Sequence, residues 1–286
     1  MGQTAVNGVV VSTMAAFENK GSRVSRRSFC ICLLLPIFFA SVSGNAFGQS
    51  CPHPNYPTAT PTAIDSSCGP QGSGGDEATQ NEAKNSFCAS GAKLMTIAGM
   101  VSLQAQVEKD TSIPFGNSEL HPLTNTPGPA KDRKPLQALG EGDEVVLTGF
   151  VKISRQEGAE SVNCGDNVPN NPADHDIHIS IVASPTDQEC TGVVVEMIPH
   201  HRPASWTPDL VNAAGTAKLP VRVTGQLMFD SSHTPCVNGK PVTTTGASDP
   251  ARSSLWEVHA IYKFEVCPQG NCSSGSGWVP IEDWKQ

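Results

Sequence analysis

The sequence lacks the short motifs that hold nucleotide cofactors and redox-active cysteines. It contains no phosphate-cradling glycine loop and no dinucleotide fingerprint, so nucleotide cofactors are not expected. No two of its 10 cysteines have the Cys-x-x-Cys spacing of a zinc or thioredoxin-like site. A hydrolase elbow is missing too, because the nearest match, at 273–277, lies in a Ser/Gly-rich tail and not on a strand-to-helix turn.

No apolar run in the chain is long enough to cross a bilayer. The longest run, residues 30–40, is well short of the roughly 20 residues that a spanning helix needs. It follows Arg26-Arg27 and precedes small residues up to Gly48, which is typical of a signal peptide cleaved before Phe47 or Gln49. Both the twin-arginine and the general secretion route fit. We expect a periplasmic or extracellular protein with no membrane span after cleavage.

Positive charge is scarce. Removing residues 1–48 takes away four of 19 basic residues and one of 27 acidic ones, which leaves 15 and 26 and a net charge of −11. An acidic surface repels phosphate backbones. We therefore expect no nucleic-acid partner.

Eight cysteines lie beyond residue 48, an even number in a chain that is expected to be exported. This count indicates disulfides, whose overall connectivity the sequence leaves open. One pair is predicted: Cys267 and Cys272 flank Pro268-Gln269-Gly270-Asn271, a segment that favours a tight turn and brings its ends together.

Composition divides the chain into five segments. Residues 1–48 are the signal peptide, and 49–76 form a Pro/Ser/Gly-rich linker with few aliphatic side chains. Residues 77–133 hold a helical segment and an irregular connection, because apolar residues recur at helical spacing over about 81–108, where Ser90-Gly91 could split the helix. A β-domain at 134–267 and a C-terminal tail at 268–286 complete the chain.

The β-domain is predicted to be an OB-like barrel. Strands are expected at about 144–154, 176–183, 192–198, 219–230 and 255–267, with one short helix at 206–215 between the third and fourth strands. This order of elements is that of the five-stranded OB-fold, whose loops after strands one and four commonly bind ligands. Here those loops, 155–175 and 231–254, are the longest in the domain. The fold is thus mainly β with minor α, although a generic small barrel or sandwich also fits.

Alternation along three strands selects polar residues on the face opposite the core. In the second strand the isoleucines at 177, 179 and 181 share the core face. The same parity argument applies to the third and fifth strands, which neighbour the second in an OB barrel. We therefore expect five side chains to converge within reach of one another: Asp176, His178, Glu196, Glu257 and His259.

Two interpretations of this set compete. It could be a zinc, manganese or iron site with ligands His178, Glu196, Glu257 and His259, and with Asp176 or Asp230 as catalytic base; His233 lies near the barrel rim and is a further candidate ligand. It could instead be a hydrogen-bonded network in which carboxylates hold the imidazoles. The scattered residues lack the tight spacing of a His-Glu-x-x-His helix.

Five stretches of the chain resemble a group of uncharacterised exported bacterial proteins. They are Glu160-Ser161-Val162-Asn163-Cys164, Asp176-Ile177-His178-Ile179, Val195-Glu196-Met197-Ile198-Pro199, residues 221–233 and Trp256-Glu257-Val258-His259. Members of that group usually have Pro where this chain has Ala260. The resemblance, over about 134–267, implies that the acids and histidines act as a set, and it implies no particular reaction.

The function expected first is an exported, non-enzymatic domain that binds a small molecule, a glycan or an envelope protein through its two long loops. The alternative is a metal-dependent, phosphodiesterase-like hydrolase that uses the His/Glu/Asp set. A purely structural role is third. The metal content of the purified protein separates the first two.

Overall fold

The computed structural model describes residues 69–85, 89–110, 113, 133–164, 172–199, 202–241, 250–273 and 275–285. All of them belong to one compact unit, Gly48–Gln286. The expected signal peptide and most of the expected linker lie outside the described residues. No helix among those residues is long and apolar enough to span a membrane.

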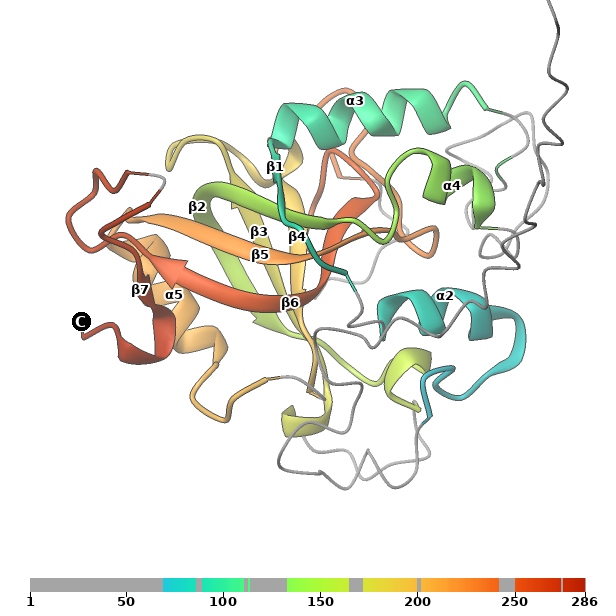
Figure 1. Ribbon diagram of the computed structural model, residues 1–286, viewed down its shortest axis with the longest axis horizontal. Coiled ribbons are helices and arrows are strands. Elements are labelled where there is room, and N and C mark those ends of the chain that lie inside the picture. Colours follow the sequence, from blue (N-terminus) through green and yellow to red (C-terminus); the bar gives the residue numbers. More distant parts are fainter. Residues whose placement is uncertain are drawn as a thin grey trace, which may run out of the picture. The chain divides into compact units, whose positions relative to one another are not determined.

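Five strands close into a barrel with the connectivity of an OB-fold (Figure 1). They are β2 (Glu144–Gln156), β3 (Ile177–Val182), β4 (Val193–Met197), β5 (Pro220–Phe229) and β6 (Trp256–Val266). The order around the barrel is β2-β3-β4-β6-β5, and β5 pairs with β2 to close it. Only the β4–β6 contact is parallel among these five pairings. The predicted OB-like fold is confirmed.

The N-terminal segment is less helical than the apolar spacing predicted. It forms α2 (Ala78–Lys84), then β1 (Lys93–Met95), which pairs in parallel with β2, then α3 (Ile97–Val107). Gly91 has a φ of 78°, which ends any continuous helix there. The side chain of Thr96 accepts a hydrogen bond from the amide of Gly99 and caps α3. Leu94, expected on an apolar helix face, is 85% exposed on β1.

The remaining helices are short. The predicted helix between the third and fourth strands is α5 (Pro208–Thr216), capped by Thr207. It packs on β2, where the Asn212 amide bonds both the N–H and the C=O of Ser154, at 2.7 and 2.9 Å. The others are α4 (Lys134–Ala138) and the 3-10 helices η1 (Gly75–Glu77), η2 (Ser161–Asn163), η4 (Pro172–Asp174), η5 (Glu189–Thr191) and η7 (Ile281–Asp283).

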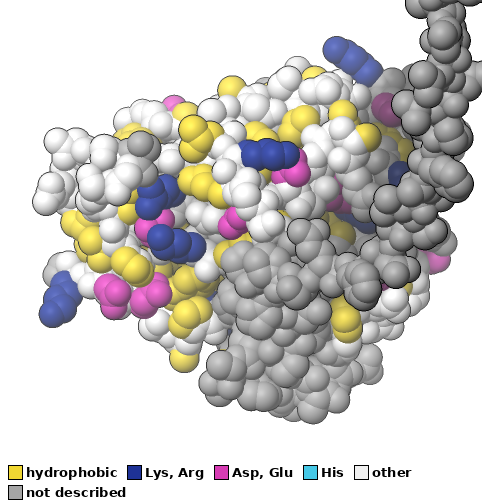
Figure 2. All heavy atoms as spheres, viewed as in Figure 1, with side chains coloured by type: hydrophobic (Ala, Val, Ile, Leu, Met, Phe, Trp, Pro, Cys, Tyr) yellow, Lys and Arg dark blue, Asp and Glu magenta, His cyan; other side chains and the backbone are white. Residues whose placement is uncertain are grey.

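The C-terminal tail extends the sheet. Its strand β7 (Val279–Pro280) pairs antiparallel with β6. Ile281 is fully buried, and the indole N–H of Trp206 donates to Glu282 at 2.9 Å. On the face shown in Figure 2, acidic and basic side chains of the described residues lie among each other, with hydrophobic side chains scattered between them.

Strand β3 is buried on both of its faces. Ile177, Ile179 and Ile181 face the hydrophobic core as the alternation predicted. On the opposite face His178 and Ser180 are also fully buried. Burying an imidazole is unfavourable unless polar partners surround it. The polar face of the strand therefore belongs to an enclosed polar cluster and not to the solvated surface.

Two disulfides join described cysteines. Cys267 and Cys272 are paired, as the turn between them predicted, at the end of β6. Cys190 and Cys236 are also paired, which links η5, just before β4, to the loop after β5. Cys164 is disulfide-bonded as well.

Candidate functional site

Strand register brings three of the candidate side chains together. Antiparallel pairing places His178 of β3 directly opposite Glu196 of β4. Parallel pairing places Val195 beside Val258 in β6, so Glu196 and His259, each one residue further along, share a face. Cross-strand neighbours on one face lie within side-chain reach of each other. The parity argument is therefore sound for these strands.

Both imidazoles contact the same carboxylate oxygen. Glu196 Oε2 lies 3.2 Å from His178 Nε2 and 2.9 Å from His259 Nε2. Asp176, just before β3, approaches His259 Nε2 with its Oδ2 at 3.6 Å. All four side chains are fully buried. We call His178, Glu196, His259 and Asp176 the central cluster.

The contact of His259 Nδ1 determines where the His259 ring carries its proton. Nδ1 lies 2.8 Å from the carbonyl oxygen of Lys84, and a carbonyl only accepts, so Nδ1 carries a proton. Nε2 faces the carboxylates and has two possible states. Either it carries a second proton and donates to a carboxylate, or it is unprotonated and its lone pair binds a cation. Burial alone would lower the pKa of His259, but Glu196 and Asp176 outweigh it and raise the pKa to about 10. Without a metal, His259 is thus an imidazolium.

The carboxylates of the central cluster are held ionised. Burial works to raise the pKa of Glu196, yet His178, Lys84 and His259 bring it well below the usual value. The pKa of Asp176 is lowered in the same way by His259 against the effect of burial. Asn163 also donates to Asp176 Oδ1 at 2.9 Å. The cluster is anionic enough to require either imidazolium or a cation.

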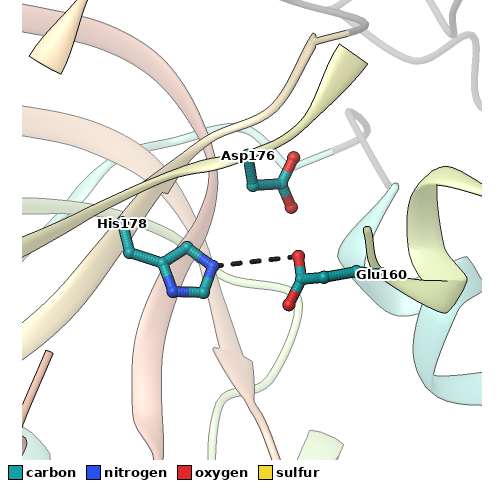
Figure 3. Close-up of side chains that lie close together, drawn as sticks. All are labelled: Glu160, Asp176 and His178. Carbon is teal, nitrogen blue, oxygen red and sulfur yellow. Dashed lines mark ion pairs between the residues drawn. The ribbon is translucent and has the colours of Figure 1, made fainter. Parts of the chain in front are cut away.

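A third carboxylate reaches the cluster from the loop after β2. Figure 3 shows Glu160 extending from that loop toward His178, with Asp176 beside both; Glu160 Oε2 is 3.8 Å from His178 Nε2. Glu160, Asp176 and His178 each offer one possible metal-ligand atom, and these atoms lie within 4.8 Å of one another. The same holds for Asp176, Glu196 and His259. Glu160 was not among the candidate site residues predicted from the sequence, although it lies in one of the two loops predicted to bind a ligand.

Asp230 follows β5 and forms an ion pair beside the central cluster. Its Oδ2 is 2.7 Å from Lys84 Nζ and 3.3 Å from His233 Nε2. Burial would raise the pKa of Asp230, but Lys84 and then His233 lower it strongly. Burial likewise would lower the pKa of Lys84, which Asp230 and Glu196 instead raise. Lys84 comes from α2, a helix whose contact with the barrel mouth the sequence did not reveal.

Glu257, one of the predicted ligands, forms an ion pair with an arginine. It shares a face of β6 with His259, but its Oε2 lies 3.0 Å from Arg252 Nη1, and both side chains are buried. It belongs to none of the three groups of possible ligand atoms among the described residues, whereas His233 joins Glu196 and Asp230 in the third. Alternation along a strand predicts which face Glu257 lies on. It does not predict the ion pair of Glu257, because Arg252 lies in a loop.

A small polar pocket reaches the cluster from outside. It measures about 200 Å³ and is lined by Glu77, Gln80, Asn81, Lys84, Glu160, Ser161, Val162, Ser232 and His233. Its walls are α2 and the two long loops. Because Lys84, Glu160 and His233 also contact buried cluster residues, the pocket is the approach to the central cluster. We call it the loop pocket.

The central cluster contains donor atoms that could hold a metal ion. Asp176, Glu196 and His259 each offer one such atom within 4.8 Å of the others, and Asp176 Oδ2 lies 3.6 Å from His259 Nε2. Tetrahedral bonds of about 2.0–2.2 Å hold ligand atoms about 3.3–3.6 Å apart. Within the described part of the chain, Asp176 Oδ2, both Glu196 oxygens and His259 Nε2 make no well-aligned hydrogen bond. Buried polar atoms rarely stay in that state without an ion or water.

Comparison of the chain with protein-family models, curated proteins and solved structures found no match. The resemblance to exported bacterial proteins therefore stays a prediction, and the functional argument rests on the site itself.

Proposed function

We propose that the barrel binds one divalent metal ion in the central cluster and uses it to hydrolyse a small substrate that enters through the loop pocket. The observation that carries this proposal is the buried group of Asp176, Glu196 and His259, whose ligand atoms lie within 4.8 Å of one another. These three residues are the proposed ligands, with His178 beside them. An imidazole nitrogen and carboxylate oxygens are donors that bind zinc and manganese.

The contact between His259 and the Lys84 carbonyl supports a ligand role. A metal-bound histidine usually donates its other ring N–H to a carbonyl or carboxylate, which fixes the tautomer and the ring orientation. His259 has this arrangement, because Nδ1 meets the Lys84 carbonyl and Nε2 faces the cluster. Imidazole nitrogen and carboxylate oxygen together suit zinc, manganese or iron.

Glu160 is the proposed general base. It lines the loop pocket and lies against His178, so it can meet both the substrate and a water in the cluster. A bound ion would make such a water acidic enough to lose a proton near neutral pH. Asp230, considered from the sequence, is tied to Lys84 at 2.7 Å and is less free to take a proton.

Binding without catalysis is a second candidate, because the loop pocket is bounded by the two loops that bind ligands in OB-folds. Its volume of about 200 Å³ is below the roughly 300–1,000 Å³ of drug-sized ligand sites. The pocket thus suits a small polar group better than an extended glycan or an envelope protein surface.

We propose that the protein works outside the cytoplasm, in the periplasm or beyond the cell. The two disulfides between described cysteines support this location. Disulfides persist in oxidising compartments and are rare where thiols are kept reduced.

Metal analysis of the exported, purified protein tests the proposal. We expect about one zinc, manganese or iron per chain in the wild type and loss of that metal in His259→Asn. The matched control is His175→Asn, which alters a histidine that is also buried at this end of the barrel but whose Nδ1 faces the Glu157 carbonyl. A wild type that carries no metal and takes up none on dialysis against zinc contradicts the proposal.

Hydrolysis of bis(p-nitrophenyl) phosphate and p-nitrophenyl acetate by the metal-loaded protein separates the two candidates. Because a positioned base contributes about 10²–10⁴-fold, Glu160→Gln should lower kcat at least about 100-fold with metal retained. Glu189→Gln, which removes a carboxylate that pairs with Arg155 elsewhere on the barrel, should leave kcat unchanged. Metal without hydrolysis of either substrate favours binding alone.

A further inference from the structure

A further group of possible metal ligands lies beside the three proposed ones. Glu160, Asp176 and His178 each offer one atom, and these atoms lie within 4.8 Å of one another. In Figure 3 the three side chains point toward one another. We call them the outer group, because Glu160 also lines the loop pocket. Asp176 belongs both to this group and to the proposed metal site, and its carboxylate has two oxygens with which to bridge two ions.

His178 lies among more carboxylates than its own charge can balance. Glu157 Oε1 lies 3.7 Å from Nδ1, and the Oε2 atoms of Glu160 and Glu196 lie 3.8 and 3.2 Å from Nε2. The ring is fully buried, and even as an imidazolium it carries a single positive charge. Carboxylates that lie this close repel one another unless a cation balances them. The proposed metal ion lies on the Glu196 side of the ring, and a second ion between Glu160 and His178 would balance the charge on the other side.

The two ring nitrogens of His178 have different surroundings. Nδ1 faces Glu157, whereas Nε2 faces Glu160 and Glu196. A carboxylate beside one ring nitrogen is common in histidines that bind a metal through the other nitrogen, because it orients the ring. Nε2 is therefore the ring nitrogen directed toward the outer group.

Glu160 directly precedes η2, and contacts on both sides hold η2 in place. The amide of Ser73 donates to the carbonyl of Ser161 at 2.8 Å. Asn163, at the end of η2, donates to Asp176 Oδ1 at 2.9 Å, so one short helix orients two members of the outer group. Within the described residues Glu160 Oε2 is buried and accepts no hydrogen bond. An ion coordinated by this oxygen would satisfy it.

We propose that the outer group binds a second, weaker divalent ion, and that this ion inhibits hydrolysis. The inference rests on the proposed function, from which it takes the first ion and the role of Glu160 as base. A carboxylate that coordinates an ion cannot at the same time accept a proton from the attacking water. The second ion is the weaker one because it shares Asp176 with the first ion and is repelled by it. Activity thus depends on metal concentration, with a maximum when one ion is bound.

Equilibrium dialysis against rising concentrations of zinc, with bound metal counted per chain, tests the second site. The wild type should bind one ion at low zinc and a second at higher zinc. Loss of an outer partner of a metal site costs about 10–100-fold in affinity, so loss of a ligand in Glu160→Gln should weaken the second ion about 100-fold or more. The first ion should stay. Glu160 lies in a loop and its side chain is 21% exposed, so this isosteric variant should fold.

Two further variants locate the second ion. His178→Asn removes the imidazole of the outer group and should also lose the second ion. Glu82→Gln is the matched control, because it removes an exposed carboxylate of α2 that does not line the loop pocket. It should bind two ions as the wild type does.

Hydrolysis measured over the same range of zinc tests the inhibition. The kcat of the wild type should rise as the first ion binds and then fall toward the kcat of Glu160→Gln as the second binds. The residual activity of Glu160→Gln should not fall further in excess zinc. Excess zinc that leaves the wild-type activity unchanged, or raises it, overturns the inhibitory role.

The count of bound ions separates failure of this inference from failure of the proposed function. A wild type that takes up one ion and no second at millimolar zinc overturns the inference and leaves the proposed function in place. A wild type that takes up none overturns both. A second ion that persists in both Glu160→Gln and His178→Asn lies elsewhere and overturns the assignment to the outer group.

Discussion

His259 shows how one contact can decide the chemistry of a residue. The Lys84 carbonyl fixes the proton on Nδ1, so the ring must present Nε2 to Glu196 and Asp176. The His259 side chain then balances the charge of these carboxylates as an imidazolium, or it binds a metal ion together with them. Alternation along β6 could predict the face of His259, because period two is a property of any strand. It could not predict Lys84, which is 175 residues away in the chain from its partner.

Replacing His259 tests this balance in the metal-free protein. With EDTA present, His259→Asn should lower the free energy of unfolding by about 3–5 kcal/mol, because it leaves buried carboxylates without their counter-charge. Urea unfolding monitored by fluorescence measures the change. His175→Asn is the control and should cost clearly less. Equal losses in the two variants would mean that His259 is an ordinary buried histidine.

Asp230 gives a prediction that depends on pH. Its pKa is lowered in the folded protein, against the effect of burial, by Lys84 and His233. A depressed carboxyl pKa stabilises the fold above the unfolded value of about 4, and this stabilisation is lost as pH falls below it. Asp230→Asn should therefore cost about 3 kcal/mol or more at pH 7. The gap to the wild type should narrow below about pH 4 in urea titrations; a gap that stays constant down to pH 3 contradicts this assignment.

Among the elements, α2 contributes most to the site that sequence analysis could not predict. Apolar spacing predicted one helical segment over about 81–108, but the core contacts of α2 are polar. Gln80 donates to Asp230 at 3.0 Å, Lys84 pairs with the same residue, and Asn81 donates to the carbonyl of Gln71 at 3.2 Å. Hydrophobic periodicity cannot detect a helix that is held in place by polar contacts. Strands β3, β4 and β6 were predictable, because apolar residues that face the core recur at every second position along them.

The ion pair of Lys84 should matter far more than a similar pair on the surface. Lys84→Met removes the ammonium partner of the buried Asp230, and it should lower the free energy of unfolding by about 3–5 kcal/mol. Lys93→Met breaks a 2.7 Å pair with Asp143 whose lysine is 65% exposed, and it should cost at most about 1 kcal/mol. Hydrogen exchange should also rise across residues 78–84 in Lys84→Met only. Equal exchange in the two variants would show that α2 is held by other contacts.

At the scale of the whole molecule, the order of elements was sufficient to predict the barrel. Five strands with a helix between the third and fourth match the OB connectivity, and the structure closes β5 onto β2 as that fold requires. The tail was less predictable, because the two-residue strand β7 is too short to give a pattern. Cys267 and Cys272 were predictable from a local turn, whereas the 46-residue separation of Cys190 and Cys236 has no local signal.

The two disulfides should differ in their effect on stability. The chain-entropy relation gives about 4 kcal/mol for a separation of 46 and about 2 kcal/mol for a separation of 5. The double variant Cys190→Ser/Cys236→Ser should therefore melt at a lower temperature than Cys267→Ser/Cys272→Ser. Differential scanning calorimetry provides the comparison, and the reverse order would show that native-state contacts dominate.

A crystal structure of the zinc-loaded mature protein, with anomalous data collected on both sides of the zinc absorption edge, tests the central claim most directly. The account predicts one anomalous peak about 2.0–2.2 Å from His259 Nε2, a Glu196 oxygen and an Asp176 oxygen. It also predicts that the Lys84 carbonyl still accepts from His259 Nδ1. A map with no peak in the cluster, and with His259 Nε2 donating directly to Glu196, would contradict the account and leave a structural network in its place.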